Sequence, residues 1–163
     1  LWSNGSYNGI LIEATSKLNI ADLESRYDNI NCYRELISSS NTLEDVIDKC
    51  KFDVDDNNFV LASIDVDGDD LNVAKSLGKY KPIILIVEPN GDVITRSNSN
   101  GSTIKELIDF GVDFGYDFMG MSGHVGRHSG NVYLIRNDYK DKFDICSKPW
   151  QQRGIILSEG VLY

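Results

Sequence analysis

The segment 59–71, with the sequence FVLASIDVDGDDL, constrains the fold of this chain more than any other stretch. It opens with an apolar run rich in β-branched residues, which predicts a buried strand over residues 59–64. The chain then changes abruptly to four aspartates and a glycine, and the next apolar pattern predicts a helix over residues 71–77. Ligands of open α/β sheets bind just beyond the carboxyl ends of the strands. We therefore expect a functional site where this strand ends.

The four carboxylates of this turn belong to Asp65, Asp67, Asp69 and Asp70. They would repel one another without a cation, a hydroxyl-bearing ligand or N–H donors nearby. A solvated acidic turn at the start of a helix explains Asp69 and Asp70 equally well. Asp65 and Asp67 are thus the stronger functional candidates.

Apolar runs and helical patterns alternate along the rest of the chain. The expected strands cover residues 9–13, 30–33, 83–88, 115–121 and 131–136, and the expected helices cover residues 18–27, 43–50 and 103–114. Fully apolar strands that alternate with helices are typical of a mostly parallel sheet covered on both faces. The fold class predicted is therefore a three-layer α/β sandwich in a single domain, residues 1–163.

Side chains near the helix ends support these boundaries. Thr42 and Asp45 form an approximate capping box ahead of the helix that follows them. Gly78 is a suitable stop for the helix at 71–77. The side chains expected on the buried face of the helix at 103–114 are those of Ile104, Leu107, Ile108 and Val112.

Three of the expected strands end in an acid, at Glu13, Asp65 and Glu88. Acids at the ends of successive parallel strands line one crevice, which is the arrangement of a site. A helix-terminal acid is the alternative interpretation of Glu13, and a loop acid is that of Glu88. The loop 89–102, rich in Gly, Asn and Ser, is long for a compact domain.

Net charge, the length of the apolar runs and the number of cysteines exclude several classes of function. The net charge is −9 and the pI is near 4.6, which argues against a nucleic-acid or anionic-membrane surface. No apolar run is long enough to span a bilayer, and no signal peptide is visible. Cys32, Cys50 and Cys146 are odd in number and scattered, so we expect reduced, structural thiols in a cytoplasmic protein.

Several motifs follow one another in an order similar to that of a known family. They are GILIEA at 9–14, N-x-x-C-x-x-E-L-I at 29–37, LASIDVDGDDLNV at 61–73, KPIILIVEPN at 81–90, GSTIKEL at 101–107, GYDFMGMSG at 115–123 and GNVYLIRND at 130–138. This series resembles the FkbM-type group of class I methyltransferases over roughly residues 5–140, which leaves 141–163 as a tail.

The resemblance implies S-adenosylmethionine (SAM) as cofactor and O-methylation of a small molecule or glycan. We expect no metal, and the acidic net charge predicts no nucleic acid or membrane as partner. The sheet of the family has an antiparallel last strand. The cofactor-binding residues implied are Glu13, which would accept hydrogen bonds from the ribose hydroxyls, Ala14 and Asp65. The catalytic residues implied are Asp65 and Asp67, and the acceptor-side residues are Glu88, Asn90, His124 and Arg127.

The chain departs from the family before Gly9. The first strand and glycine-rich turn of the family lie in that region, and here only eight residues precede Gly9. The strand concerned is the central one, between the strands that end in Glu13 and Asp65. We expect one of three repairs: a tail strand at 154–157, a strand from another chain in a homo-oligomer, or direct pairing of the two edges.

Two other functions compete with methyl transfer. A non-catalytic remnant or assembly module would keep the fold without the cofactor, and the missing turn favours it. Asp65-x-Asp67-Gly68 also resembles the nucleophile loop of haloacid-dehalogenase-type phosphatases, which hold Mg²⁺ with carboxylates. His124 and His128 have the i, i+4 spacing of metal ligands, but the surrounding glycines make a helix there improbable, so a loop over the crevice is expected.

Overall fold

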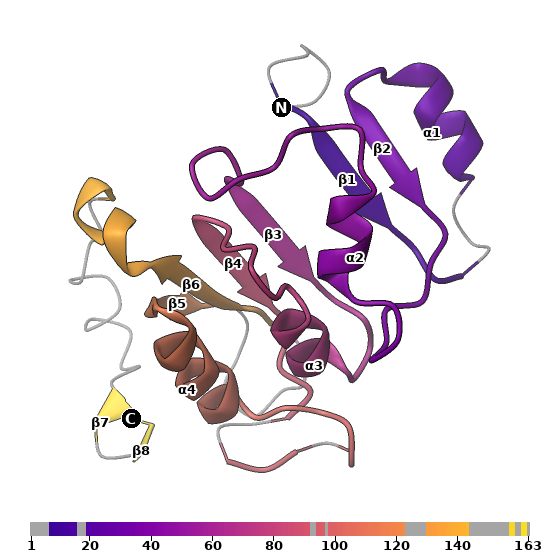
Figure 1. Cartoon of the computed structure of the whole chain (residues 1–163). Coiled ribbons are helices and arrows are strands. Elements are labelled where there is room, and N and C mark those ends of the chain that lie inside the picture. Colours follow the sequence, from indigo (N-terminus) through magenta and orange to yellow (C-terminus); the bar gives the residue numbers. More distant parts are fainter. Residues whose placement is uncertain are drawn as a thin grey trace.

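The computed structural model describes residues 7–15, 19–91, 94–96, 98–122 and 130–143, and the backbone of 157–158 and 161–162. The chain is a mixed α/β protein with a two-stranded sheet, a four-stranded sheet and a short hairpin (Figure 1). None of the helices in the described ranges is long and apolar enough to cross a membrane.

The two-stranded sheet is built from the first part of the chain. Strand β1 (Gly9–Ile12) pairs in parallel with β2 (Ile30–Tyr33), and helix α1 (Ile20–Arg26) connects them. The Asn19 side chain accepts a hydrogen bond from the backbone N–H of Asp22 and so caps α1. A helical crossover is what a parallel pair requires.

The four-stranded sheet has the order β3-β4-β6-β5. Strand β3 (Leu61–Ile64) is parallel to β4 (Ile84–Val87), whereas β6 (Val132–Arg136) is antiparallel to both β4 and β5 (Tyr116–Met121). Only β6 therefore runs against the other three strands. The expectation of a reversed last strand in the main sheet is met by β6.

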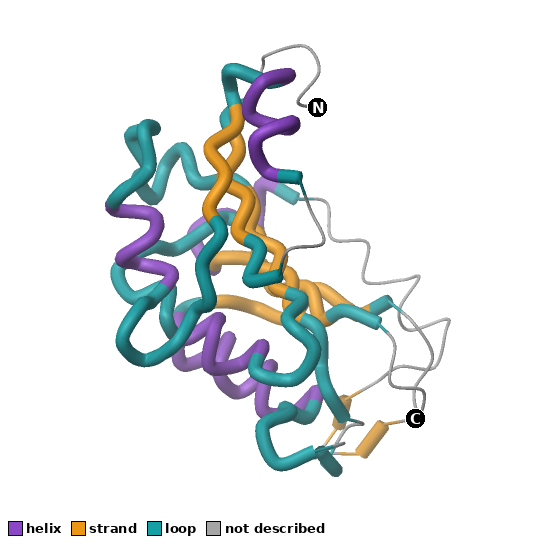
Figure 2. Tube along the Cα trace, turned by 90° about the vertical axis from the view of Figure 1, so that its right-hand side faces the viewer, coloured by secondary structure: helices purple, strands orange, loops and turns teal. Residues whose placement is uncertain are grey.

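Helices α2 (Leu43–Asp48), α3 (Asp70–Lys75) and α4 (Ile104–Phe114) lie on one side of the strands (Figures 1 and 2). Complete capping boxes begin α2 at Thr42 and α4 at Thr103. Helix α2 thus begins at the predicted residue, and α3 and α4 begin within one residue of their predicted starts. Gly78, in the left-handed region at φ +57°, follows α3 closely.

One core lies between these helices and the four-stranded sheet. Its members come from every strand of that sheet and from all three helices: Leu43, Ile47, Ile64, Val73, Ala74, Leu77, Tyr80, Leu85, Val87, Ile104, Leu107, Tyr116, Met121, Val132 and Leu134. Ile10 and Ile12 of β1 pack against the same core. Both sheets therefore border one interior.

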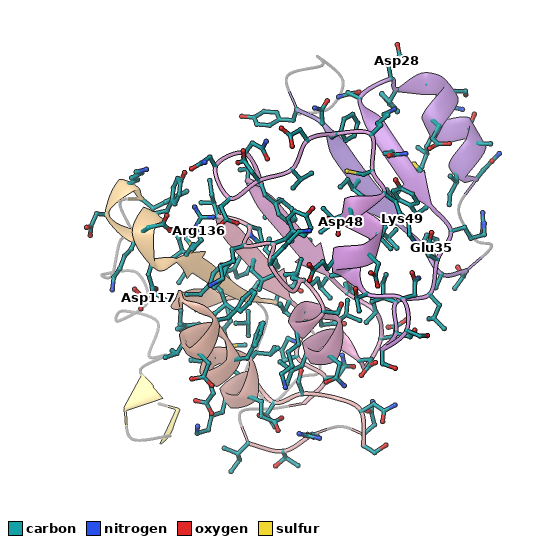
Figure 3. All side chains as sticks on the ribbon, viewed as in Figure 1. Asp28, Glu35, Asp48, Lys49, Asp117 and Arg136 are labelled. Carbon is teal, nitrogen blue, oxygen red and sulfur yellow. The ribbon has the colours of Figure 1, made fainter. Side chains whose placement is uncertain are left out.

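Arg136 joins the end of β6 to two neighbouring segments (Figure 3). Its guanidinium donates to the backbone carbonyl oxygens of Asp56 and Lys81, each at 2.6 Å, and to Asp138 Oδ1 at 2.7 Å. A buried cation held by acceptors of three residues is a structural contact, because any unpaired donor there would cost free energy.

The expectation of one continuous sheet is wrong for the described residues. β1 bonds only to β2, and β3 bonds only to β4, so the two edges that face each other do not pair. The described tail strands β7 (Leu157–Ser158) and β8 (Val161–Leu162) pair with each other. Two of the three expected repairs, direct pairing and a tail strand, are therefore not made by the described strands.

Two expectations of burial are also corrected. The strand at 59–64 is not buried throughout, since Val60 is 43% exposed and Leu61 is 49% exposed. This follows from the position of β3 at a sheet edge. On α4, Ile104 and Leu107 are buried as expected, but Val112 is 60% exposed, because the residue of that turn that faces Leu134 of the sheet is Gly111.

Candidate functional site

The carboxyl ends of β3 and β4 bring three acids together. Asp65 follows β3 directly and Glu88 follows β4 directly, and Ile64 is in register with Val87. Carboxylate oxygens of Asp65, Asp67 and Glu88 all lie within 4.8 Å of one another. We call these three residues the acidic cluster. It contains two of the three acids that the sequence places at strand ends, Asp65 and Glu88.

Asp70 shapes the turn that carries the cluster. Its side chain is buried, at 1% exposure, and its two oxygens accept hydrogen bonds from the backbone N–H groups of Val66 (2.8 Å) and Gly68 (3.0 Å). Asn90 Nδ2 donates to Asp70 Oδ2 at 2.7 Å. Asp70 therefore ties the turn after β3 to the loop after β4.

The backbone between these contacts is bent sharply. Asp67 has φ +57° and Gly68 has φ +133°, both in the left-handed range. Aspartate tolerates this conformation better than most non-glycine residues, though at some cost in free energy. The bend places the Asp67 carboxylate beside Asp65 and Glu88 rather than along the helix that follows.

The electrostatics of the cluster centre on Glu88. Partial burial, followed by the negative charge of Asp65 and a hydrogen bond with it, raises the pKa of Glu88 to about 7. Burial also raises the pKa of Asp70, although the N–H donors of Val66 and Gly68 oppose this. Near neutral pH, Glu88 can therefore hold a proton or release it.

The loop after β4 packs tightly beside the cluster. A Cβ on Gly91 would lie 2.4 Å from the carbonyl oxygen of Thr95, and one on Gly101 would lie 2.5 Å from that of Asn90. Asn98 Oδ1 accepts hydrogen bonds from the backbone N–H of Gly101 at 2.6 Å and from that of Asn100. The glycines of this loop are thus required for close backbone packing.

Glu13, the third acid expected at a strand end, is not a member of the acidic cluster. It follows β1, and its Oε1 accepts from the backbone N–H of Thr15 at 2.7 Å. Ala14 beside it is exposed. β1 and β3 do not pair, so Glu13 and Asp65 follow strands of two different sheets.

The remaining residues singled out from the sequence lie in different places. Asn90 lies next to the cluster, bonded to Asp70, so the structure brings it close to the predicted acids. His124, Arg127 and His128 lie outside the described residues. Cys32 and Cys50 are free thiols, as the sequence predicts.

Sequence reasoning missed the part played by Asp70, which it left as a solvated helix acid. The available signal was the spacing: an acid that follows a glycine by two residues can accept from N–H groups of the preceding turn. The apolar strand before it makes such a turn half-buried, and a buried carboxylate then needs donors.

Oxygen ligands and negative charge define what the cluster can bind. Three carboxylates within reach of one point suit a cationic ligand, a divalent cation or a ligand with hydroxyl groups. Glu88, with a pKa near 7, can also accept a proton from a bound hydroxyl. Comparison with protein-family models, with curated proteins and with solved structures gives no match for this chain.

Proposed function

We propose that this chain is a SAM-dependent methyltransferase domain that acts on a hydroxyl group of a small molecule or glycan. The supporting observation is the strand arrangement: β1 and β2 run parallel, β3 and β4 run parallel, and β6 alone is reversed. With one strand between β1 and β3, this would be the three-layer Rossmann-like sheet of that family.

The charges of the site fit such a cofactor. SAM carries a positive sulfonium, and the acidic cluster offers three carboxylates close to one point. Glu13, with Ala14 after it, would hold the ribose hydroxyls, as a carboxylate does in dinucleotide-binding folds. Bound there, the cofactor would supply an activated methyl group.

The residues of this chain would then orient the acceptor and take its proton. Asp65 and Asp67 would position the acceptor hydroxyl in line with the methyl group, and Asn90 would fix the loop beside them through Asp70. Glu88 is the best proton acceptor of the cluster, since its pKa lies near the working pH. His124 and Arg127 are proposed to contact the acceptor from the neighbouring loop.

A thermal-shift titration with SAM and with its demethylated product tests cofactor binding. A ligand at a hundred times its Kd stabilises the native state by about 2.7 kcal/mol, which raises the melting temperature by several degrees for a domain of this size. We expect Glu13→Ala to abolish the rise and Asp113→Ala, an exposed acid on α4, to leave it. No rise for the unmodified chain at millimolar ligand would favour the non-catalytic assembly module instead.

The proximity of Asp65, Asp67 and Glu88 also supports a second candidate, a Mg²⁺-dependent phosphatase of the haloacid dehalogenase type. Asp65 would be the nucleophile and Asp67 the acid two residues later. Hydrolysis of p-nitrophenyl phosphate with and without Mg²⁺ separates the two functions. Metal-dependent turnover that Asp65→Asn removes would replace the methyltransferase proposal.

A further inference from the structure

We propose that Glu24 and Lys51 close the outer edge of β2, so that this edge does not pair with the same edge of a second copy of the chain. The outer edge is the side of β2 that faces away from β1 (Figure 1). An open edge strand is a template for further pairing, because its N–H and C=O groups can bond to another strand. The proposal concerns assembly and holds whether or not the domain transfers methyl groups.

The hydrogen bonds between β1 and β2 show which groups of β2 form this edge. The backbone N–H of Glu13, just after β1, donates to the carbonyl oxygen of Tyr33 at 2.9 Å, so the backbone groups of Tyr33 face β1. Alternate residues of a parallel strand face the same neighbour. The N–H and C=O groups of Ile30 and Cys32 therefore point away from β1.

Helix α1 brings a carboxylate to this edge. Glu24 Oε1 accepts a hydrogen bond from the backbone N–H of Cys32 at 3.0 Å. A carboxylate binds an N–H group more strongly than a neutral acceptor does. The end of the helix is also joined to the strand, because the backbone N–H of Ile30 donates to the carbonyl oxygen of Tyr27 at 3.2 Å. Two successive outward N–H groups of β2 thus already have acceptors.

The segment after α2 brings an ammonium group to the same edge. Lys51 Nζ donates to the carbonyl oxygens of Asp28 and Ile30, each at 3.0 Å. The backbone N–H of Lys51 donates to Asn31 Oδ1, also at 3.0 Å. Because the backbone and the side chain of this lysine both bind residues 28–31, the ammonium group is held at the edge of β2.

A second strand could pair here only by displacing both side chains. It would replace the charged partners of the Cys32 N–H and the Ile30 C=O with neutral ones, which make weaker hydrogen bonds. The side chains of Ile30 and Cys32 are already buried, at 2% and 9% exposure, so the new pair would bury little further apolar area. Displacement of Glu24 and Lys51 is therefore unfavourable.

The outer edge of β5, at the end of the four-stranded sheet, is interrupted in another way. The register of β5 against β6 shifts between Phe118 and Gly120, and Gly120 has φ +152°. Such an irregularity bends an edge strand and breaks the ladder that an added strand would need. At β2 the ladder is regular, so the obstacle there consists of two side chains that substitution can remove.

Without these side chains, the edge of β2 fits a copy of itself. Two identical edges can pair antiparallel about a two-fold axis, in which each copy supplies the donors and acceptors that the other needs. The sequence of β2, INCY, contains Ile and Tyr, which favour strands. The partner that we infer for the opened edge is therefore β2 of a second copy.

Light scattering and hydrogen exchange followed by NMR test this on the full chain. In the unmodified chain, exchange of the Cys32 amide should not change between about 10 μM and about 1 mM protein. In Glu24→Ala/Lys51→Met, the mass should rise toward that of a dimer over the same range, and exchange of the Cys32 amide should slow by at least about tenfold.

Two further double variants are the controls. Ser25→Ala/Lys49→Met removes a hydroxyl and an ammonium group from the same two segments, but these groups bind Asp22 and Glu35 instead of the edge, so it should behave as the unmodified chain does. Glu24→Gln/Lys51→Arg keeps an acceptor and donors at the edge, and it should stay monomeric.

A single variant covers the case in which the double variant does not fold. At about 10 μM, the Cys32 amide of Glu24→Ala should exchange at least about tenfold faster than that of the unmodified chain, and equal rates would overturn the proposal. Three other results would also overturn it: a folded Glu24→Ala/Lys51→Met that stays monomeric at about 1 mM, a dimer of that variant in which the Cys32 amide is not slowed, or slowing of this amide with concentration in the unmodified chain.

Discussion

Two strands of similar composition have different surroundings in the two sheets. β1, with the sequence GILI, has all four residues half-buried, whereas β4, with ILIV, has Leu85 and Val87 fully buried. β4 lies between two strands and under helices, while β1 has one neighbour among the strands that the structure describes. The helices beside the two sheets differ in the same way: α1 has no buried residue, whereas α4 has three. Burial is thus decided by the neighbours of a strand more than by its own residues.

Leucine truncation should show this difference most strongly. Leu85→Ala removes a fully buried side chain of β4 and should lower the free energy of unfolding by about 3 kcal/mol. Leu11→Ala in half-buried β1 should lower it by about 1 kcal/mol. Urea denaturation of both variants measures the values. Equal losses would mean that β1 is covered as fully as β4.

A substitution in the turn after β3 should cause the second largest loss of stability. Asp70→Asn should lower the free energy of unfolding by about 2 kcal/mol, because the neutral amide cannot accept from Val66, Gly68 and Asn90 as a carboxylate does. Asp69→Asn, which keeps an oxygen for Asn72, is the matched control, with an expected change below about 0.5 kcal/mol. Similar losses for both variants would contradict the anchoring role of Asp70.

Glu88 gives the smallest effect and one that depends on pH. Its pKa is raised from 4.5 to about 7 in the folded state, so its contribution to stability is complete below pH 4.5 and is lost as the pH rises to about 7. Glu88→Gln cannot lose a proton, and relative to the unmodified chain it should gain about 1–2 kcal/mol between pH 4.5 and 8, allowing for partial exposure. Urea denaturation at several pH values checks the slope, and a difference independent of pH would exclude the raised pKa.

Much of the fold follows from local patterns in the sequence. Cap residues predict the helix starts at Thr42 and Thr103. Apolar runs predict the positions of the strands β1 to β6. The meeting of Asp65 with Glu88 is also predictable, since parallel strands bring their carboxyl ends to one edge. Such features depend on short stretches of chain.

The remaining features depend on pairing between distant segments. An apolar run such as 59–64 reads the same whether it becomes a central strand or an edge, so the exposure of Leu61 could not be predicted. The anchoring by Asp70 needs a loop twenty residues away to supply Asn90. The periodicity of apolar residues in the sequence does not show which strands become neighbours or which loops come into contact.

Asp67 has a left-handed backbone conformation, in which an aspartate is less stable than a glycine would be. Glycine at this position would relieve about 1 kcal/mol of steric strain, since it has no Cβ to clash with the neighbouring carbonyl. The chain instead carries an acid there, next to two others that repel it. Selection for stability alone would favour the smaller residue, so a carboxylate at this point costs the fold twice, in conformation and in charge. Such double costs concentrate where a protein uses a side chain rather than merely accommodates it.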